Sequence, residues 1–180
     1  MYDFHYNYIK TKYGDKEKLL VTDTDSLAYE FTTKDFYKDI NPDIEKRFDT
    51  SDHPSNHRSG IKTGLNVLGM FKNEAGGKQI VEFVGLRAKL YSYKMLDGSE
   101  DKKFKEVTKN VTNRSIQFDD YRECLFSRKE QNLKMNVIRS HCHEIYTEEI
   151  NKISLSSDDA KRVIMADGIH TLAYGHTNCN

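Results

Sequence analysis

The stretch LLVTDTDSLAYEF, residues 19–31, holds two aspartates whose spacing could support metal chemistry. An apolar run leads into Asp23, one residue separates it from Asp25, and an alternating apolar run follows. This pattern predicts two strands joined at the acids. Two neighbouring carboxylates repel each other, and Mg²⁺ relieves such repulsion by binding one or two carboxylates together with substrate phosphates. The chemistry would then be metal-assisted phosphoryl transfer.

An Asp-x-Asp pair has other interpretations. Most such pairs are exposed turn residues that form local hydrogen bonds. An EF-hand calcium loop is excluded because, with Asp23 as its first position, the sixth position is Ala28 instead of Gly and the twelfth is Lys34 instead of Glu. The residue pattern therefore leaves an ordinary exposed turn and a magnesium site as alternatives.

A second group of residues could bind an anion. In LRAKLYSYKM, strand alternation predicts one face that carries Arg87, Lys89, Tyr91 and Tyr93. Lys and Arg neutralise nucleic-acid phosphates, and Tyr hydroxyls position them. Residues 86–139 hold 13 basic against 8 acidic side chains, although the whole chain is neutral. The alternative is an amphipathic strand in which tyrosines pack on lysine stems.

Histidines and cysteines do not favour a zinc site. The candidates are His141, Cys142, His143, His170, His176 and Cys179. On a strand, only His141 and His143 share a face, and no Cys-x-x-Cys pair exists. Three cysteines do not suit a secreted disulfide framework, so a reducing, intracellular compartment is expected. Apolar runs are far shorter than a bilayer requires, so no membrane partner is expected.

The pattern along the chain predicts an α+β fold built mainly from hairpins. A first helix over residues 1–13 is expected to bury Tyr2, Tyr6, Ile9 and Tyr13 and to stop at Gly14. The other expected elements are short helices in residues 32–48, a loop at 49–64, two strands joined by Ala-Gly-Gly in 68–85, a helix near 118–126, and strands at 135–141 and 144–155.

Two motifs together carry a resemblance to a known family. Thr22-Asp23-Thr24-Asp25-Ser26 resembles motif C of family B DNA polymerases, and Lys89-Leu90-Tyr91 resembles their Lys-x-Tyr motif. The chain is most similar to protein-primed members from viruses, linear plasmids and Maverick/Polinton elements, from the lead helix FHYNYIKTKYGD to the closing DGIHTLAYGH. The resemblance implies an antiparallel palm sheet with the motif C hairpin and flanking helices over residues 1–115. A small β-rich thumb is implied over residues 116–180.

The resemblance assigns roles to the site residues. Asp25 corresponds to a direct ligand of two catalytic Mg²⁺ ions, with Mn²⁺ as an alternative, and Asp23 to a less constant ligand. Lys89 and Tyr91 correspond to the pair that steadies the primer terminus and the template–primer duplex. Arg87 joins them because it is expected to share their face. One departure is that Lys103-Phe104-Lys105 is followed by Glu106, where relatives have glycine after a basic stretch.

The implied activity is that of a DNA-directed DNA polymerase, which adds deoxynucleotides from triphosphates to a primer 3′-hydroxyl, first supplied by a terminal protein. The sequence lacks the motif with a further metal-binding aspartate and the fingers motif that grips the triphosphate. We therefore expect a C-terminal portion that is inactive alone and needs a missing N-terminal part. The alternatives are a split polymerase and a non-catalytic DNA-binding remnant or recruited module.

Overall fold

The computed structural model describes residues 1–57, 59–62, 64, 66–104, 107–158, 162–168 and 170–177. Of residues 109, 110 and 112 it describes the backbone only. The chain divides into a first unit, Met1–Val81 with Met95–Ser99, and a second unit, Glu82–Lys94 with Glu100–Asn180. Within the described ranges, every helix is too short or too polar to span a bilayer.

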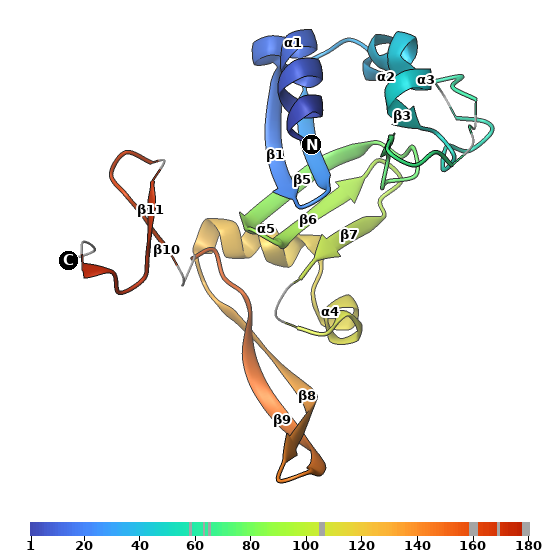
Figure 1. Cartoon of the computed structure of the whole chain (residues 1–180). Helices are drawn as coiled ribbons and strands as arrows, with labels where there is room; N and C mark the ends of the chain where they lie inside the picture. Colours follow the sequence, from blue (N-terminus) through green and yellow to red (C-terminus); the bar gives the residue numbers. More distant parts are fainter. Residues whose placement is uncertain are drawn as a thin grey trace. The chain divides into compact units, whose positions relative to one another are not determined.

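The first unit begins with a helix and a hairpin, as the sequence predicts (Figure 1). Gly14, with a φ of 55°, caps the α-helical segment at the predicted stop. The hairpin pairs its two strands antiparallel. In order, the elements are the π-helix η1 (Asp3–Ile9), α1 (Lys10–Tyr13), η2 (Gly14–Lys16), β1 (Glu17–Asp23), β2 (Ser26–Phe31), α2 (Phe36–Ile40), η3 (Asn41–Asp43), α3 (Ile44–Arg47), β3 (Phe48–Asp49) and β4 (Phe71–Lys72).

The first helix buries a different face from the predicted one. Tyr2 and Tyr6, expected in the core, are 83% and 60% exposed. Phe4 and Tyr8 are buried instead, together with Ile9 and Tyr13. The predicted helix is thus confirmed, and its predicted apolar stripe is half wrong.

The π-helical winding of η1 explains this difference. The backbone N–H of Lys10 donates to the carbonyl oxygen of His5, five residues earlier, so a turn holds more than 3.6 residues. Apolar residues spaced by four and five positions then fall on one face. This face packs against Leu27, Tyr29, Phe31, Phe36, Phe48 and Phe71. The stacked rings of Phe4 and Phe71 are 3.8 Å apart, which brings β4 against the helix.

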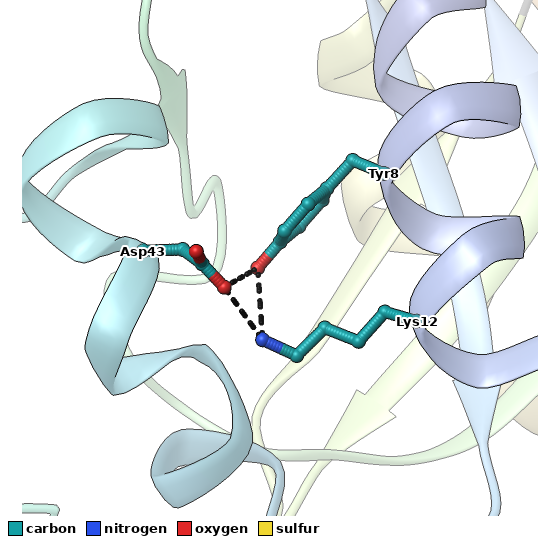
Figure 2. Close-up of polar contacts among 3 residues, drawn as sticks. All are labelled: Tyr8, Lys12 and Asp43. Atoms are coloured by element: carbon teal, nitrogen blue, oxygen red, sulfur yellow. Dashed lines mark hydrogen bonds and ion pairs between the residues drawn. The ribbon is translucent and has the colours of Figure 1, made fainter.

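A polar contact fastens the first helix to η3 (Figure 2). The hydroxyl of Tyr8 donates to Asp43 Oδ2 at 2.9 Å, and Lys12 Nζ reaches the same oxygen at 2.6 Å. Hydrogen bonds from Lys12 and Tyr8 hold the pKa of the Asp43 carboxyl below its usual value, while burial raises the pKa of Tyr8. The guanidinium of Arg47 covers the Tyr8 ring at 4.6 Å from its centroid.

Tyr8→Phe tests this contact. The substitution keeps the buried ring but leaves Asp43 with one donor fewer, so we expect a loss of about 1 kcal/mol in the free energy of unfolding. Urea unfolding followed by circular dichroism measures it. The matched control is Tyr6→Phe, which removes a hydroxyl from an exposed ring of the same helix and should leave stability unchanged. Equal effects of the two variants would contradict the role given to Asp43.

In its described residues, the second unit contains a three-stranded sheet, two helices and two hairpins. The sheet order is β5-β6-β7, and the hairpins are β8-β9 and β10-β11. The elements are β5 (Ile80–Arg87), which starts in the first unit, β6 (Leu90–Met95), β7 (Glu100–Lys103), α4 (Lys109–Ser115), α5 (Phe118–Ser127), β8 (Gln131–His141), β9 (Glu144–Leu155), β10 (Arg162–Ile164) and β11 (Thr171–Ala173).

The core of the second unit lies between the sheet and α5. Tyr121, at the centre of α5, has no exposed surface; its hydroxyl donates to the Lys103 carbonyl at 3.2 Å and its ring meets Phe104 edge-on. The side chain and backbone of Gln117 and Asp120 form a reciprocal capping box that starts the helix. The buried members of this core are Val84, Leu90, Ile116, Phe118, Tyr121, Cys124 and Leu155.

The α+β class is confirmed. The described strands are divided among several small sheets, all antiparallel except β3-β4. The predicted hairpin over residues 68–85 is wrong, because β4 pairs parallel with β3 and β5 pairs with β6. A two-residue parallel pairing between distant segments leaves no local sequence signal. The proposed boundary between residues 115 and 116 stays a prediction, and α4 and α5 on its two sides belong to the same unit.

Candidate functional site

The acid pair lies at the turn of a packed hairpin. β1 ends at Asp23, β2 begins at Ser26, and these two residues are opposite each other in the register. Ser26 Oγ donates to the Asp23 carbonyl oxygen at 3.2 Å, which closes the turn. Asp25 is exposed at the tip, and Asp23 is half-buried. The predicted hairpin with both acids at its tip is confirmed: Asp23 is the last residue of β1, and Asp25 lies in the two-residue turn that follows.

The turn is strained at Thr24. Its φ is 40°, a left-handed value that is unfavourable for a β-branched side chain and costs on the order of 1–2 kcal/mol. Hairpins with positive φ at this position normally use glycine. Strain of this kind persists where the surrounding structure enforces it, and it concentrates at functional sites. Thr24 Oγ1 also donates to Asp23 Oδ1 at 3.4 Å.

The hairpin is held by the first helix. Tyr29 of β2 is linked to His5 Nδ1 through its hydroxyl at 2.9 Å, and burial raises the pKa of Tyr29 to about 12. At the start of β1, the buried Glu17 carboxylate contacts Lys10 Nζ at 2.5 Å. These contacts fix the strands on which the turn depends.

The donor chemistry at the turn fits a magnesium ion. Carboxylate oxygens are the ligands that Mg²⁺ prefers, and it commonly takes one or two of them while keeping water or phosphate at its other positions. In the ranges that the structure describes, no group of three or more His, Cys, Asp or Glu side chains is arranged to hold a metal. Two carboxylates supply fewer ligands than a Mg²⁺ ion takes, so Asp23 and Asp25 could hold one only together with substrate phosphate or another protein segment.

The cationic residues lie around a second turn, which corrects the predicted strand face. β5 ends at Arg87 and β6 begins at Leu90, so Ala88 and Lys89 form a turn between antiparallel strands. Lys89 is exposed and has a left-handed φ of 61°. Arg87 therefore precedes a turn and Lys89 lies in it, and the prediction that they continue one strand face with Tyr91 is wrong.

Tyr91 is buried, not presented on a surface. It is 6% exposed, and its ring lies 5.7 Å from that of Phe83. The neighbouring Ser92 and Tyr93 are buried as well, and the Tyr93 hydroxyl donates to Asp101 Oδ2 at 2.9 Å. Both faces of β6 are covered, so alternation could not distinguish them. The DNA-contacting role of Tyr91 stays a prediction, and Lys89 is the exposed member of its motif.

Comparisons with protein-family models, with curated proteins and with solved structures found no match. The functional interpretation therefore depends on the two motifs and on the turns that carry them. Of the basic stretch where the sequence departs from the family pattern, Lys105 and Glu106 lie outside the described residues, and Lys103 ends β7.

Those residues weighed for zinc that lie in the described ranges form no group that could hold a metal ion. His141 ends β8, and Cys142 and His143 form the two-residue turn to β9, with φ values of 48° and 66°. Cys124 is a buried free thiol and Cys142 an exposed one, while Cys179 lies outside the described residues. His170 is held by Asp167 through its backbone and ring nitrogens.

Sequence reasoning missed a histidine cluster in the loop at residues 49–64. The rings of His53 and His57 meet edge-on at 4.9 Å, and His57 Nε2 lies 2.7 Å from the Gly77 carbonyl oxygen. The Tyr37 hydroxyl donates to the same oxygen at 3.1 Å. Gly77 has a φ of 79°, and a Cβ at this position would lie 3.0 Å from Cδ2 of the His57 ring, so a larger residue would be crowded there. The one feature of the sequence that could have indicated this cluster is the spacing of four residues between His53 and His57 in a polar loop.

The cluster predicts a pH-dependent stability. Burial, followed by the neighbouring His57, lowers the pKa of His53, although Asp52 acts in the opposite direction. Below about pH 6.5 the unfolded chain takes up a proton that the folded chain resists, so stability decreases as pH falls through that value. We expect the free energy of unfolding to fall less steeply in His53→Phe than in wild type between about pH 7.5 and pH 5.5. Urea titrations measure this, and parallel slopes would contradict it.

Proposed function

We propose that this chain is the C-terminal palm and thumb part of a protein-primed family B DNA polymerase. The observation that carries the proposal is the placement of Asp23 and Asp25 on the turn of an antiparallel hairpin packed on the preceding helix. The motif C resemblance requires this arrangement, and an exposed Lys89 at a later turn agrees with its second motif. The thumb is assigned to residues 116–180 by the resemblance.

In this proposal the chain's own residues position two substrates. Asp25, exposed at the tip, and Asp23 would hold two Mg²⁺ ions, which supply the Lewis acidity that stabilises attacking and leaving oxygens in phosphoryl transfer. Lys89 would neutralise a phosphate of the primer–template duplex. The reaction joins the primer 3′-oxygen to the α-phosphorus of a deoxynucleoside triphosphate and releases pyrophosphate. A terminal protein would provide the first hydroxyl.

Two carboxylates cannot hold two metals and a triphosphate without help. The further aspartate and the fingers motif are not in this sequence, so the proposal requires a segment that carries them. The chain alone is expected to be inactive.

The test mixes the full chain with a polypeptide containing the exonuclease, fingers and upstream palm of a protein-primed polymerase. Extension of a labelled primer should need both polypeptides and Mg²⁺. Failure to extend, although both polypeptides are folded and bind DNA, would contradict the proposal.

A second candidate function is a non-catalytic DNA-binding module. The exposed Lys89, two residues after Arg87 in a basic part of the sequence, favours it. This function predicts salt-sensitive binding of primer–template DNA with no nucleotide incorporation in any mixture. The reconstituted extension assay separates it from the leading proposal, since the two agree on binding and differ on synthesis.

Lys89→Ala tests the DNA contact in both versions. Loss of one phosphate contact should weaken binding at every DNA sequence and reduce the slope of log K against log salt by about one. Fluorescence anisotropy at several salt concentrations measures both. Lys18→Ala is the matched control, because Lys18 is an exposed lysine in β1 at the opposite end of its hairpin from the acids. An unchanged slope for Lys89→Ala would remove Lys89 from the interface.

A further inference from the structure

The first strand of the acid-pair hairpin contains an extra residue. Leu19 of β1 is opposite Tyr29 of β2, and the next pair along the hairpin is Val21 with Ala28. The register therefore shifts at Leu20, where β1 has one residue more than β2. Such a β-bulge bends its strand and increases the local twist, and bulges are frequent beside active sites, where they re-aim a side chain.

The bulge determines the length of the connection between the strands. In a regular ladder, in which Leu20 had a partner, the last pair would be Thr22 with Ser26, and residues 23–25 would connect the strands. Because the bulge shifts the pairing by one residue, the last pair is instead Asp23 with Ser26, and the connection has two residues. The bulge and the short turn are thus two parts of one arrangement.

Local stability does not explain this arrangement. The regular ladder would contain as many residue pairs, and a three-residue loop is a common hairpin connection whose third residue is left-handed. Asp25 would be that residue, and aspartate adopts a left-handed backbone more readily than a β-branched residue does. With the bulge, Thr24 has a φ of 40° instead. The hairpin therefore combines a bulge with a strained threonine, although a regular pairing would avoid both.

The short turn changes how the first acid is held. As the last residue of β1, Asp23 lies opposite Ser26, whose Oγ donates to the Asp23 carbonyl oxygen at 3.2 Å. In the regular ladder both acids would lie in the loop. Functional groups on strands are held more precisely than those on loops. The bulge thus gives one carboxylate a fixed backbone and leaves the other, that of Asp25, exposed at the tip.

We propose that Leu20 is a positioning residue for the acid pair. By forming the bulge, it shortens the connection and places Asp23 on the strand while Asp25 stays in the turn. The inference rests on the proposed function, in which the two carboxylates hold Mg²⁺. It gives a part in the metal site to an apolar residue whose own side chain binds nothing.

Two engineered disulfides distinguish the two registers. Val21→Cys with Ala28→Cys joins positions that are opposite each other in the bulged hairpin. Leu20→Cys with Ala28→Cys joins positions that would be opposite in the regular ladder. Both pairs are made in the full chain with Cys142→Ser and Cys179→Ser. In the folded, reduced chains, diamide should close the 21–28 pair at least about tenfold faster than the 20–28 pair, because disulfide geometry is strict. Thiol titration measures the closure.

The activity test uses the same chains in the reconstituted extension assay. Oxidation during refolding from urea closes either disulfide and fixes the corresponding register. The chain fixed at 21–28 should extend primers at the rate of its reduced form. The chain fixed at 20–28 should extend them about 100-fold more slowly, because a misplacement of about 1 Å can cost this much. It should also need more Mg²⁺ for its half-maximal rate, and dithiothreitol should restore both properties.

The outcomes separate this inference from the proposed function. Circular dichroism should show that both oxidised chains are folded, so that a slow rate reports the register. Equal closure of the two cysteine pairs would overturn the positioning role, as would equal extension and Mg²⁺ dependence of the two oxidised chains. If every chain fails to extend primers, reduced or oxidised, the proposed function fails and the positioning role fails with it.

Discussion

Asp25→Asn should lower the rate of primer extension by about 10²- to 10³-fold in the reconstituted polymerase proposed above. The substitution keeps the size of the side chain and removes the charge that would hold the catalytic metals. Asp25 is exposed at the hairpin turn, so the fold should tolerate the change. Gel analysis of extended primers at saturating triphosphate measures the effect.

The control for this prediction is Glu30→Gln. Glu30 is an exposed acid at the other end of β2, opposite Lys18, and its replacement removes one negative charge from the same hairpin. Extension should be unaffected. Asp23→Asn should reduce extension less than Asp25→Asn, following the less constant role of the first aspartate in the family. Full activity of Asp25→Asn would exclude this hairpin as the metal site.

Tyr121→Ala should destabilise the second unit by about 3–5 kcal/mol. The side chain is fully buried among the core residues, so truncation leaves a large cavity and also removes the bond from its hydroxyl to the Lys103 carbonyl. Since Leu90 belongs to the same core, the turn that carries Lys89 should lose its support. Chemical denaturation followed by near-ultraviolet circular dichroism measures the change.

Two controls separate the contributions of Tyr121. Tyr121→Phe keeps the ring and should cost only about 1 kcal/mol, the value of one hydrogen bond. Phe126→Ala removes a similar ring from the same helix, but Phe126 is 79% exposed and its loss should change stability little. If Phe126→Ala were as destabilising as Tyr121→Ala, the core would be wrongly assigned.

Local patterns predicted those elements whose signals are local. Alternation around the acid pair identified the β1-β2 hairpin. Strands were also expected at residues 135–141 and 144–155, in segments whose pattern is ambiguous between strand and helix, and β8 and β9 confirm them. The turn at Lys89 gave no such signal, because a lysine there adopts the left-handed φ that glycine or asparagine normally supplies. Alternation continued through the turn and suggested one strand. The parallel β3-β4 pair depends on tertiary packing alone, and its four residues could not be recognised in advance.

In the candidate site, too, the features that depend on local sequence were predicted and those that depend on tertiary packing were not. The sequence predicted Asp23 and Asp25 at the tip of a hairpin because strand-like runs flank them on both sides. It did not predict that Tyr91 would be buried, since the burial of both faces of β6 depends on α5 and β7. The histidine cluster around Gly77 joins residues twenty positions apart, and no periodicity reports such a contact.

The π-helix at the start of the chain has a consequence for insertions and deletions. Its buried residues Phe4, Tyr8, Ile9 and Tyr13 are spaced for a widened turn. Removing the exposed Tyr6 would change this spacing to that of an ordinary α-helix, with the same four side chains at intervals of three, one and four. A chain shortened by that residue could retain its buried face. We therefore expect the first helix to tolerate the presence or absence of this one residue while keeping the same buried side chains against the hairpin that follows it.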